Sequence, residues 1–477
     1  MWTAEEIAAI VGGRVHRPDP VKRIQGFSID SRRISPGDLF VALPGTRTDG
    51  HLYVRDAYAQ GAHGALVRCP PDPLSDPVCN CIEVSDPLRA LQELARAYRR
   101  RFRIPLVGIT GSSGKTTTKE LLYTILSERY RAYRSPGNYN SEIGLPLALL
   151  AMPPEPDAEV GIFELALQRP GEIALLAGIL EPSIGLITTI GDAHLGFFRS
   201  QEELARAKWA LVERLGRGGT AVLNFDAPFL RDWAGELRSS RKVIGFGIKH
   251  PDAAVRAVHL DDASPEGLSL EVALGIATPE TTFPVRTRLL GRPNAYNVLG
   301  AIAVAFELGV PIPSIQRALE RFRPVPHRLE LKRSERFGLV LDDTYNANPT
   351  SVREALRTLA RLDVPGHSKV FVFGDMLELG EHSLRFHREL ADCIDALGID
   401  LVFTVGERAA ETACALMKRD RWAGRVERAR SPDELSGLLE TRLPGHRHLV
   451  LVKGSRGMAL EKLVAKMLGA PTTPAAR

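Results

Sequence analysis

Short apolar runs alternate with longer amphipathic segments through the middle of the chain. The runs that predict buried parallel strands lie at residues 106–110, 160–165, 184–190 and 220–224. Segments 115–127 and 201–215, which separate these runs, have the spacing of helices. Alternating strands and helices are typical of a doubly wound parallel sheet, so the sequence predicts a central α/β domain.

The pattern changes between residues 251 and 290, where apolar and polar positions alternate. Residues 268–272 and 281–289 are typical of half-buried strands, and we expect them to form an antiparallel extension of the sheet. A long helix is predicted next, at 295–308. The segment Arg323-Pro324-Val325-Pro326 then interrupts the pattern and predicts a domain boundary.

Two flanking regions also have α/β character. The strand-like runs of the first region lie at residues 24–29, 39–42 and 65–67, before a helical segment at 87–101. Those of the last region lie at residues 338–342, 370–373, 401–405 and 449–452. The sequence therefore predicts three α/β domains, the last of them Rossmann-like, at residues 1–103, 104–323 and 324–477.

Composition excludes several classes of protein. Hydrophobic residues make up 44% and charged residues 25% of the 477 residues, which is ordinary for a globular protein and excludes a disordered or fibrous chain. No apolar run is long enough to span a membrane, and the first residues do not resemble a signal peptide. A net charge of +5 without a concentrated basic stripe disfavours nucleic acid and suits phosphate-bearing substrates. We expect the five cysteines to be free thiols and the protein to be cytoplasmic.

The strongest chemical signal is the glycine-rich segment that runs from Gly108 to Thr117. It follows an apolar strand and precedes a helix, so its backbone N–H groups and the helix N-terminus can bind phosphate. Lys115 is placed to reach the terminal phosphates and Thr116 to bind magnesium. The first glycine of the strict phosphate-loop spacing would fall at residue 109, which is Ile, so the loop is a shortened variant. The alternative is a glycine turn with an incidental lysine.

Polar residues follow the predicted strands of the central domain. Glu164 closes one strand and His194 follows the next, and both are candidate metal ligands because ligands bind beyond the carboxyl ends of parallel strands. Lys208 lies in the apolar stripe of a predicted helix, between Leu204 and Leu211. A lysine there is costly unless it is paired or modified, and the alternative is a buried stem with its amine in water.

The last domain also ends its strands in polar residues. Asp342 and Asp343 close one strand, while Gly374-Asp375-Met376 and Lys453-Gly454-Ser455-Arg456 close two others. Three polar strand ends on one side predict a cleft that faces the central domain. Ordinary structural turns are the alternative for each of them.

Taken together, these segments resemble the Mur ligase family, ATP-dependent amide-bond ligases of peptidoglycan synthesis. The resemblance covers nearly the whole chain in order. Its motifs are the N-terminal segments Phe27-Ser28-Ile29-Asp30-Ser31-Arg32-Arg33 and Gly37-Asp38-Leu39-Phe40-Val41-Ala42-Leu43, the phosphate loop, Asn294-Ala295-Tyr296-Asn297, and His327-Arg328-Leu329-Glu330. It implies that the first domain binds a uridine nucleotide and that the central domain is the ATPase.

The resemblance also implies the roles of individual residues. ATP would be bound by Thr110, Gly111, Ser112, Ser113, Gly114, Lys115, Thr116, Thr117, Asn294, Asn297, Arg328 and Asp343. Magnesium, with two ions expected, would be bound by Thr116, Glu164, His194 and a carbamylated Lys208. Substrates would contact Ser28, Ser31, Arg32, Asn138, Asn140, Asn346 and Asn348. The catalytic group would be Lys115, Glu164, His194, Lys208 and Arg328.

Within the family, three motifs resemble those of the member that joins D-alanyl-D-alanine to UDP-N-acetylmuramoyl-tripeptide, and this resemblance implies a reaction through an acyl phosphate. They are residues 136–144, residues 343–349 and residues 374–380. The Asp-Asn-Pro-Arg motif expected of a diaminopimelate- or lysine-adding ligase is missing from the sequence. That sister ligase, folylpolyglutamate synthase and a non-ligating ATP-binding regulator are the alternatives. We expect a monomer that binds neither nucleic acid nor a membrane.

Overall fold

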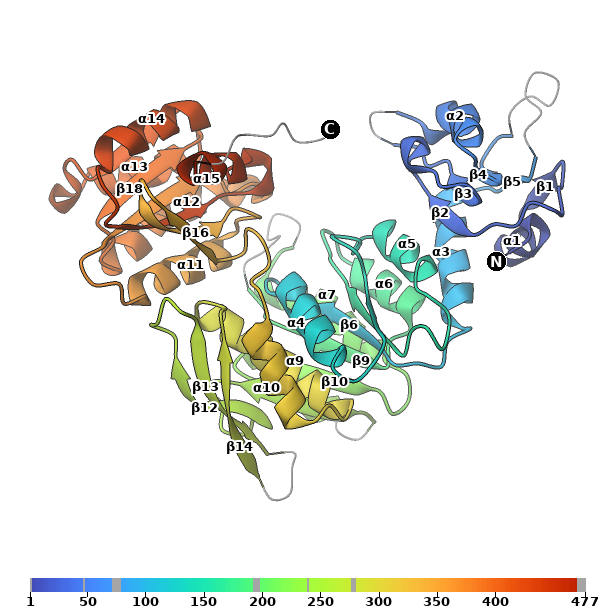
Figure 1. Ribbon diagram of the computed structural model, residues 1–477, viewed down its shortest axis with the longest axis horizontal. Helices are drawn as coiled ribbons and strands as arrows, with labels where there is room; N and C mark the ends of the chain where they lie inside the picture. Colours follow the sequence, from blue (N-terminus) through green and yellow to red (C-terminus); the bar gives the residue numbers. More distant parts are fainter. Residues whose placement is uncertain are drawn as a thin grey trace.

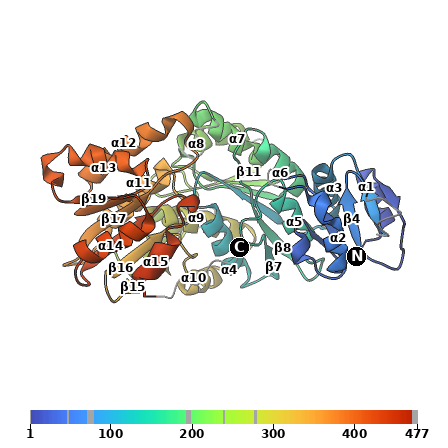
Figure 2. The same ribbon diagram turned by 90° about the horizontal axis from the view of Figure 1, so that it is seen from above.

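Three β-sheets follow one another along the chain in the computed structural model, which describes residues 2–45, 48–70, 79–191, 198–237, 240–275 and 280–469 (Figure 1). The sheets with their helices form an arc, with the first and last sheets at its two ends (Figures 1 and 2). No helix in the described residues has the length and apolar character needed to cross a membrane. The predicted division into three α/β units is confirmed, and all five cysteines are free, as expected.

The first sheet has five strands in the order β1-β5-β4-β3-β2, and all its pairs are parallel except β1 with β5. The strands are β1 (Arg14–His16), β2 (Gly26–Ser28), β3 (Asp38–Val41), β4 (Gly64–Val67) and β5 (Cys81–Glu83). The helices are α1 (Ala4–Val11), α2 (Val54–Ala59) and α3 (Pro87–Arg99), with short 3-10 turns η1 (Ser31–Arg33) and η2 (Gly50–Tyr53). Asp86 caps the N-terminus of α3, and its side chain accepts from the N–H groups of Leu88 and Arg89.

The middle sheet has nine strands in the order β14-β13-β12-β11-β10-β9-β6-β8-β7. These are β6 (Leu106–Thr110), β7 (Ala132–Arg134), β8 (Val160–Glu164), β9 (Ile184–Ile187), β10 (Thr220–Asn224), β11 (Lys242–Gly247), β12 (Val255–Asp261), β13 (Leu268–Leu274) and β14 (Thr281–Thr287). The pairs from β12 to β7 are parallel, whereas β12, β13 and β14 pair antiparallel. The predicted antiparallel extension is therefore confirmed.

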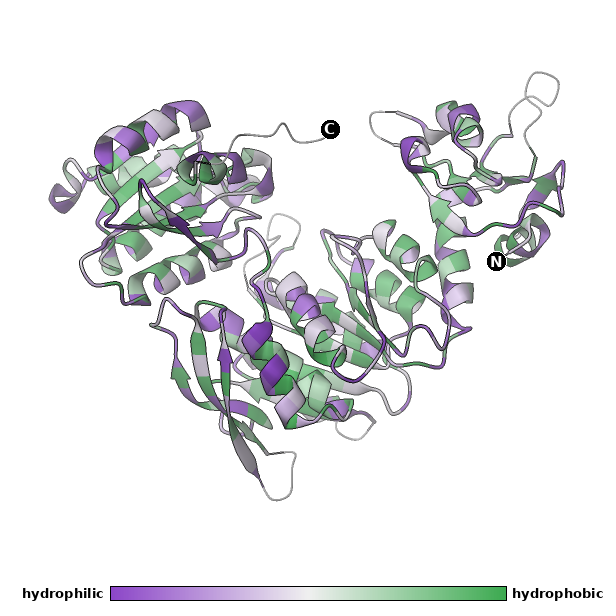
Figure 3. Cartoon of the chain, viewed as in Figure 1, coloured by the Kyte–Doolittle hydropathy of each residue, from purple (hydrophilic) through white to green (hydrophobic). Residues whose placement is uncertain are grey.

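Helices cover both faces of the middle sheet. They are α4 (Lys115–Leu126), α5 (Gly144–Leu150), α6 (Glu172–Leu180), α7 (Gln201–Glu213), α8 (Pro228–Leu237), α9 (Arg292–Glu307) and α10 (Ile312–Arg321). Val107 and Ile109 of β6 belong to one core with α4, α9 and α10, while Leu106 belongs to another with α5 and α6. This alternation explains why the parallel strands of the middle sheet are mostly hydrophobic along their length (Figure 3), and it confirms the doubly wound sheet.

The third sheet has six strands in the order β15-β16-β20-β17-β18-β19, antiparallel only between β15 and β16. Its strands are β15 (Glu330–Ser334), β16 (Gly338–Asp343), β17 (Ser368–Gly374), β18 (Leu401–Val405), β19 (Val426–Ala429) and β20 (His448–Lys453). The helices are α11 (Pro349–Arg361), α12 (Ser383–Ala396), α13 (Ala409–Met417), α14 (Pro432–Arg442) and α15 (Glu461–Met467), with turns η3 (Gly380–His382), η4 (Asp420–Trp422) and η5 (Arg456–Met458). Helices α11, α12 and α13 share one core, and α14 and α15 share the other.

Helix α3 connects the first two sheets through a continuous core. Leu91 and Leu94 of this helix are fully buried, in a cluster that contains Leu39 of the first sheet and Leu145 and Phe163 of the middle unit. The boundary predicted at residue 103 falls between α3 and β6. The exact domain limits, 1–103, 104–323 and 324–477, stay a prediction.

Contacts also join the second and third units near the other predicted boundary. The Asp262 carboxylate lies 3.0 Å from the Arg361 guanidinium of α11, and the N–H of Asp363 donates to the carbonyl of Ala263 at 2.8 Å. The Asp262 carboxylate also lies 3.3 Å from the guanidinium of Arg292 at the start of α9. Asp262 therefore links the antiparallel strands, α9 and the third unit.

One strand is shorter than the sequence predicts. The apolar run at 184–190 predicts a strand to residue 190, but β9 ends at Ile187. The Thr188 N–H still donates to the carbonyl of Thr110 at the end of β6 at 2.9 Å, but the Thr188 hydroxyl donates to the carbonyl of Ser113 in the glycine-rich loop at 2.6 Å. The Thr189 hydroxyl also contacts this loop, 3.2 Å from the Ser113 hydroxyl. These contacts come from a segment about 75 positions earlier in the chain. No local pattern could therefore show that the strand ends at Ile187.

Candidate active site

A cavity of about 450 Å³ lies between the middle and third units, and polar residues from both surround it. Fifteen residues predicted to bind ATP, metal or substrate line it: Ser112, Ser113, Gly114, Lys115, Thr116, Thr117, Asn138, Asn140, Glu164, Asn294, Asn297, Arg328, Asp343, Asn346 and Asn348. They come from segments more than 200 residues apart in the chain. The fold therefore brings most of the residues predicted for the active site to one place.

The glycine-rich loop joins the end of β6 to the start of α4. Gly114 precedes the helix with φ of 82°, and a Cβ atom built there would lie 2.1 Å from Oδ1 of Asn297. Only glycine suits this position, because the backbone is left-handed and the Asn297 amide occupies the space of a side chain. The N–H of Ser112 donates to the carbonyl of Thr189 at 2.9 Å, which holds the loop against the end of β9.

Lys115 begins helix α4 and donates from Nζ to the carbonyl of Gly111 at 2.9 Å, across the loop. Desolvation lowers the pKa of Lys115, Glu164 opposes this shift and Arg328 adds to it. The ammonium thus lies at the loop that the helix N-terminus already makes favourable for anions. An incoming phosphate would replace the carbonyl of Gly111 as its partner.

The hydroxyl of Thr116 connects three parts of the chain. It donates to Oε2 of Glu164 at 2.8 Å and accepts from Nη2 of Arg328 at 2.9 Å. Oε1 of the same glutamate accepts from Nδ2 of Asn140 at 2.9 Å. Both carboxylate oxygens of Glu164 are therefore held in place next to the loop.

The two asparagines at the start of α9 are buried beside the loop. Nδ2 of Asn297 donates to Oδ1 of Asn294 at 2.9 Å, and Nδ2 of Asn294 donates to the carbonyl of Leu290 at 2.9 Å. This chain of amides fixes the orientation of Asn297 where it faces Gly114. Both asparagines line the cavity, and their predicted role in binding ATP stays a prediction.

The backbone around Arg328 is strained. His327 and Leu329 have φ of 64° and 52°, a left-handed conformation that costs non-glycine residues free energy. Nδ1 of His327 lies 2.8 Å from Oδ2 of Asp342, and the N–H of Leu329 donates to Oδ1 of Asp343 at 3.2 Å. The two aspartates at the end of β16 thus hold the strained segment that aims Arg328 at the phosphate loop.

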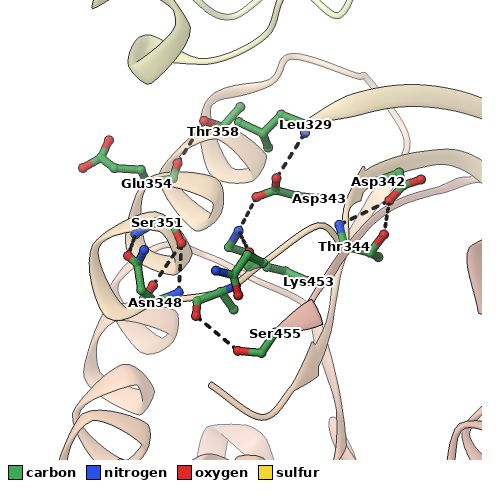
Figure 4. A network of polar contacts seen from close by, with 12 residues as sticks. Leu329, Asp342, Asp343, Thr344, Asn348, Ser351, Glu354, Thr358, Lys453 and Ser455 are labelled. Atoms are coloured by element: carbon green, nitrogen blue, oxygen red, sulfur yellow. Dashed lines mark hydrogen bonds and ion pairs between the residues drawn. The ribbon is translucent and has the colours of Figure 1, made fainter. Parts of the chain in front are cut away.

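Asp343 is not directed at the cavity alone. Its Oδ2 lies 2.5 Å from Nζ of Lys453, which is only 2% exposed and also donates to the carbonyl of Asn346 at 2.9 Å (Figure 4). Asn348 caps α11 in a reciprocal arrangement with Ser351 (Figure 4). The sequence indicated the strand end at Lys453 but gave this lysine no role, because its partner lies 110 positions earlier in the chain.

Sequence reasoning missed Lys119, which is fully buried one turn after Lys115 in α4. Its Nζ donates to the carbonyls of Ser135 at 2.8 Å and Gly137 at 2.9 Å. These bonds fix the loop that carries Asn138 and Asn140. A signal was present, because Lys119 precedes the buried Leu122 by three positions and so lies on the apolar side of its helix.

Lys208 of α7 is 2% exposed, so its amine does not reach water and the solvent-directed alternative is wrong. Desolvation lowers the pKa of Lys208 well below its usual value, and the positive charge of Lys115 lowers it further. Lys208 does not line the cavity.

His194 lies outside the described residues. Thr110 and Gly111, which precede the rest of the loop, do not line the cavity, and Thr110 is fully buried.

The three N-terminal candidates lie together, but away from this cavity. The Ser28 hydroxyl bonds the backbone of Asp30, and Ser31 is buried at the start of η1. The Arg32 guanidinium lies 2.9 Å from the Asp30 carboxylate and lowers the pKa of Asp30. These residues form a separate polar turn on the first unit.

The residues beside the loop fit a magnesium ion. The Thr116 hydroxyl and the Glu164 carboxylate are adjacent oxygen donors, and magnesium prefers oxygen ligands. Among the described residues, no group of three or more His, Cys, Asp or Glu side chains could hold a metal. A complete ligand set therefore needs groups of other kinds or from outside these residues.

A phosphate loop that faces a second α/β unit across a polar cavity defines a class of ATP-dependent enzymes. Three domain models of the Mur ligases match the chain in order. They are "Mur ligase family, catalytic domain" at residues 23–99, "Mur ligase middle domain" at 109–305 and "Mur ligase, glutamate ligase domain" at 327–456. The chain belongs to the Mur ligase family. The resemblance seen in the sequence is therefore confirmed.

Similar proteins span nearly the whole chain. The UDP-N-acetylmuramoyl-tripeptide–D-alanyl-D-alanine ligase of Bacillus subtilis is 34% identical over 98% of this chain and 99% of its own. A crystal structure of MurF from Acinetobacter baumannii has a TM-score of 0.87 at 29% identity, covering 98% of this chain and 99% of its own. The MurF ligase of Thermotoga maritima in complex with ADP has a TM-score of 0.80 at 29% identity, covering 94% of this chain and 97% of its own.

The left-handed conformation of Gly114 should make an alanine at this position harmful to nucleotide binding. A left-handed backbone costs alanine about 1–2 kcal/mol, and the methyl group of Gly114→Ala would also displace the Asn297 amide. We expect ADP binding, measured by calorimetry, to weaken by about tenfold or more. The matched control is Gly178→Ala in α6, where a Cβ atom meets open space and helix propensity favours alanine by about 1 kcal/mol. Equal ADP affinity in the two variants would contradict the assignment of the loop.

Proposed function

We propose that this chain is an ATP-dependent ligase that joins D-alanyl-D-alanine to UDP-N-acetylmuramoyl-tripeptide in peptidoglycan precursor synthesis. One observation carries the ligase chemistry: Arg328 of the third unit reaches Thr116 of the phosphate loop within one cavity. The similarity to D-alanyl-D-alanine ligases of this kind over nearly the full length supports the choice of substrates.

The first step transfers a phosphoryl group. An oxygen of the tripeptide's terminal carboxylate attacks the γ-phosphorus of ATP, the bond to the β–γ bridging oxygen breaks, and an acyl phosphate and ADP form. Lys115 and Arg328 supply positive charge at the loop, where negative charge moves between donor and acceptor oxygens. Asn294 and Asn297 orient the nucleotide beside Gly114.

Magnesium, when bound, neutralises phosphate charge. Thr116 and Glu164 would hold it, together with His194 and a carbamylated Lys208, and we propose two ions in all. A neutral amine reacts with carbon dioxide to give a carbamate and a proton, and the lowered pKa of Lys208 favours the neutral amine that this reaction needs. The carbamate would add oxygen donors to those of Thr116 and Glu164.

The second step forms the amide bond. The dipeptide amine attacks the acyl carbon, phosphate leaves, and the nitrogen loses its proton. Asn346 and Asn348 belong to the third unit's wall of the cavity, where we place the dipeptide. Burial of the site between two units limits attack by water on the acyl phosphate.

The three units would divide the work. We assign uridine-nucleotide binding to residues 1–103, ATP binding to 104–323 and acceptor binding to 324–477, in a cytoplasmic monomer. Ser28, Ser31 and Arg32 form the polar turn proposed for the nucleotide diphosphate. Asn138 and Asn140 would meet the tripeptide end, because Asn140 already bonds Glu164 beside the loop.

The proposal is tested by phosphate release against a panel of acceptors. With ATP and UDP-N-acetylmuramoyl-tripeptide present, release should be fast with D-alanyl-D-alanine and slow with D-alanine, L-lysine, diaminopimelate or glutamate. A site built for a dipeptide leaves polar groups unpaired when half of the ligand is missing. Faster turnover with lysine or diaminopimelate would favour the sister ligase, and release without any acceptor would favour a different class.

Arg32→Ala tests the role of the first unit. The Arg32 side chain is largely exposed, so its removal should leave the fold intact, and the KM for the UDP substrate should rise about tenfold or more while the KM for ATP stays within about twofold. Lys115→Ala is the contrasting variant, with a collapsed kcat and preserved UDP-substrate binding. Equal changes in both KM values for Arg32→Ala would exclude the assigned role.

Lys208 provides a chemical-rescue test. Lys208→Ala should lose nearly all activity, and added acetate should restore part of it by replacing the carbamate oxygens. Lys208→Arg should stay inactive, because a guanidinium cannot be carbamylated and repels the metal. Mass spectrometry of the native enzyme in bicarbonate labelled with carbon-13, after trapping of the carbamate, gives a readout independent of activity. Full activity of Lys208→Ala would refute the modification.

A further inference from the structure

Four positively charged side chains line the cavity in the described part of the chain: Lys115, Arg328, Lys453 and Arg456. Lys115 and Arg328 act at the phosphate loop, through Gly111 and Thr116. Lys453 is buried against Asp343 and Asn346. Arg456 is the one of these four that neither contacts the phosphate loop nor is buried.

Arg456 lies where a ligand could reach it. It begins the turn η5, three positions after the end of β20, and its side chain is 60% exposed. Nη1 of Arg456 lies 3.4 Å from Oε1 of Glu461 at the start of α15, which orients the guanidinium from one side. The guanidinium also stands over the ring of Tyr345, with Cζ 5.7 Å from the ring centroid.

The same tyrosine ring contacts Arg328, whose Cζ lies 3.9 Å from the centroid. Two guanidinium groups therefore share Tyr345, one beside the phosphate loop and one on the third unit. Because both distances end on one ring, the two Cζ atoms lie within about 10 Å of each other, and an extended dipeptide spans about 7 Å. A dipeptide whose amine lies near Arg328 can thus bring its other end to Arg456.

Ligation consumes the donor's terminal carboxylate and leaves the acceptor's C-terminal carboxylate unchanged. The donor's carboxylate must lie at the phosphate loop, near Thr116 and Lys115, whereas the acceptor's carboxylate is unchanged by the reaction and needs its own partner. Guanidinium binds carboxylate through two parallel hydrogen bonds, which fix orientation as well as charge. Glu461 and Tyr345 hold Arg456 in place for such a contact without covering most of its surface.

We propose that Arg456 binds the C-terminal carboxylate of the dipeptide acceptor and so directs its amine toward the acyl phosphate. This inference rests on the proposed ligase function. It assigns a carboxylate subsite to the third unit and makes Arg456 a specificity-determining residue. Peptides that lack a free C-terminal carboxylate are poor acceptors for this reason.

The test compares D-alanyl-D-alanine with its C-terminal amide as acceptors, by phosphate release at saturating ATP and UDP substrate. The wild-type enzyme should prefer the acid by about 10- to 100-fold in kcat/KM, mostly through KM, because a charge-assisted pair is lost with the amide. In Arg456→Ala the kcat/KM for the acid should fall by a similar factor, whereas the kcat/KM for the amide should change little. The ratio of the two values should therefore approach one. Arg456→Lys should keep part of the preference.

Arg336→Ala is the matched control. Arg336 is 58% exposed, pairs with Glu440 at 3.1 Å and stands 5.7 Å over the ring of Phe337, but it does not line the cavity. The Arg336→Ala variant should prefer the acid over the amide as strongly as the wild type does. An unchanged preference in Arg456→Ala, with the thermal midpoint of the wild type, would overturn the role of Arg456 alone. Failure of the wild type to use either dipeptide would overturn the proposed function, and the subsite with it.

Discussion

The hydroxyl of Thr116 is the contact on which the site depends. It joins the phosphate loop to Glu164 at the end of β8 and to Arg328, which enters from the third unit. Glu164 and Arg328 have opposite charges, and the neutral hydroxyl between them satisfies both, as donor to one and acceptor from the other. The loop, the candidate metal carboxylate and the cation from the third unit therefore share one geometry, so a disturbance at any of the three reaches the other two.

Parallel strand ends make this convergence possible. Strands β8, β6 and β9 are neighbours, and their carboxyl ends carry Glu164, the phosphate loop and the threonines that hold the loop. In the third sheet, β16 and β20 pair in parallel and place Asp343 beside Lys453. The two edges face each other across one cavity, so chemistry divided between two sheets is brought within the reach of small substrates.

The site keeps several costly features. Lys119, Lys208 and Lys453 are buried, and His327 and Leu329 have left-handed backbones. Specific partners offset most of these costs: two carbonyls for Lys119, Asp343 for Lys453, and the paired aspartates of β16 for the segment around Arg328. Lys208 differs, because burial and the charge of Lys115 lower its pKa. Buried lysines give fixed positive charge and fixed geometry only while those partners remain, which favours one arrangement of the loops around the cavity.

Sequence alone determined what depends on local pattern. The apolar runs predicted β6, β10 and β18 to the residue, because each is a short buried strand between clear breaks. The glycine-rich loop was recognisable because its backbone chemistry is local. The sequence analysis missed β1, β5, β7, β11, β15 and β19. The edge strands β1, β7 and β15 are polar and half-exposed, so pairing with a neighbour alone makes them strands. Tertiary structure decided which strand ends meet: that Lys119 fixes the loop of Asn140, that Lys453 pairs with Asp343, and that Arg456 shares a ring with Arg328. These partners are separated by up to 128 positions and no periodicity relates them, so only the packing of the sheets brings them together.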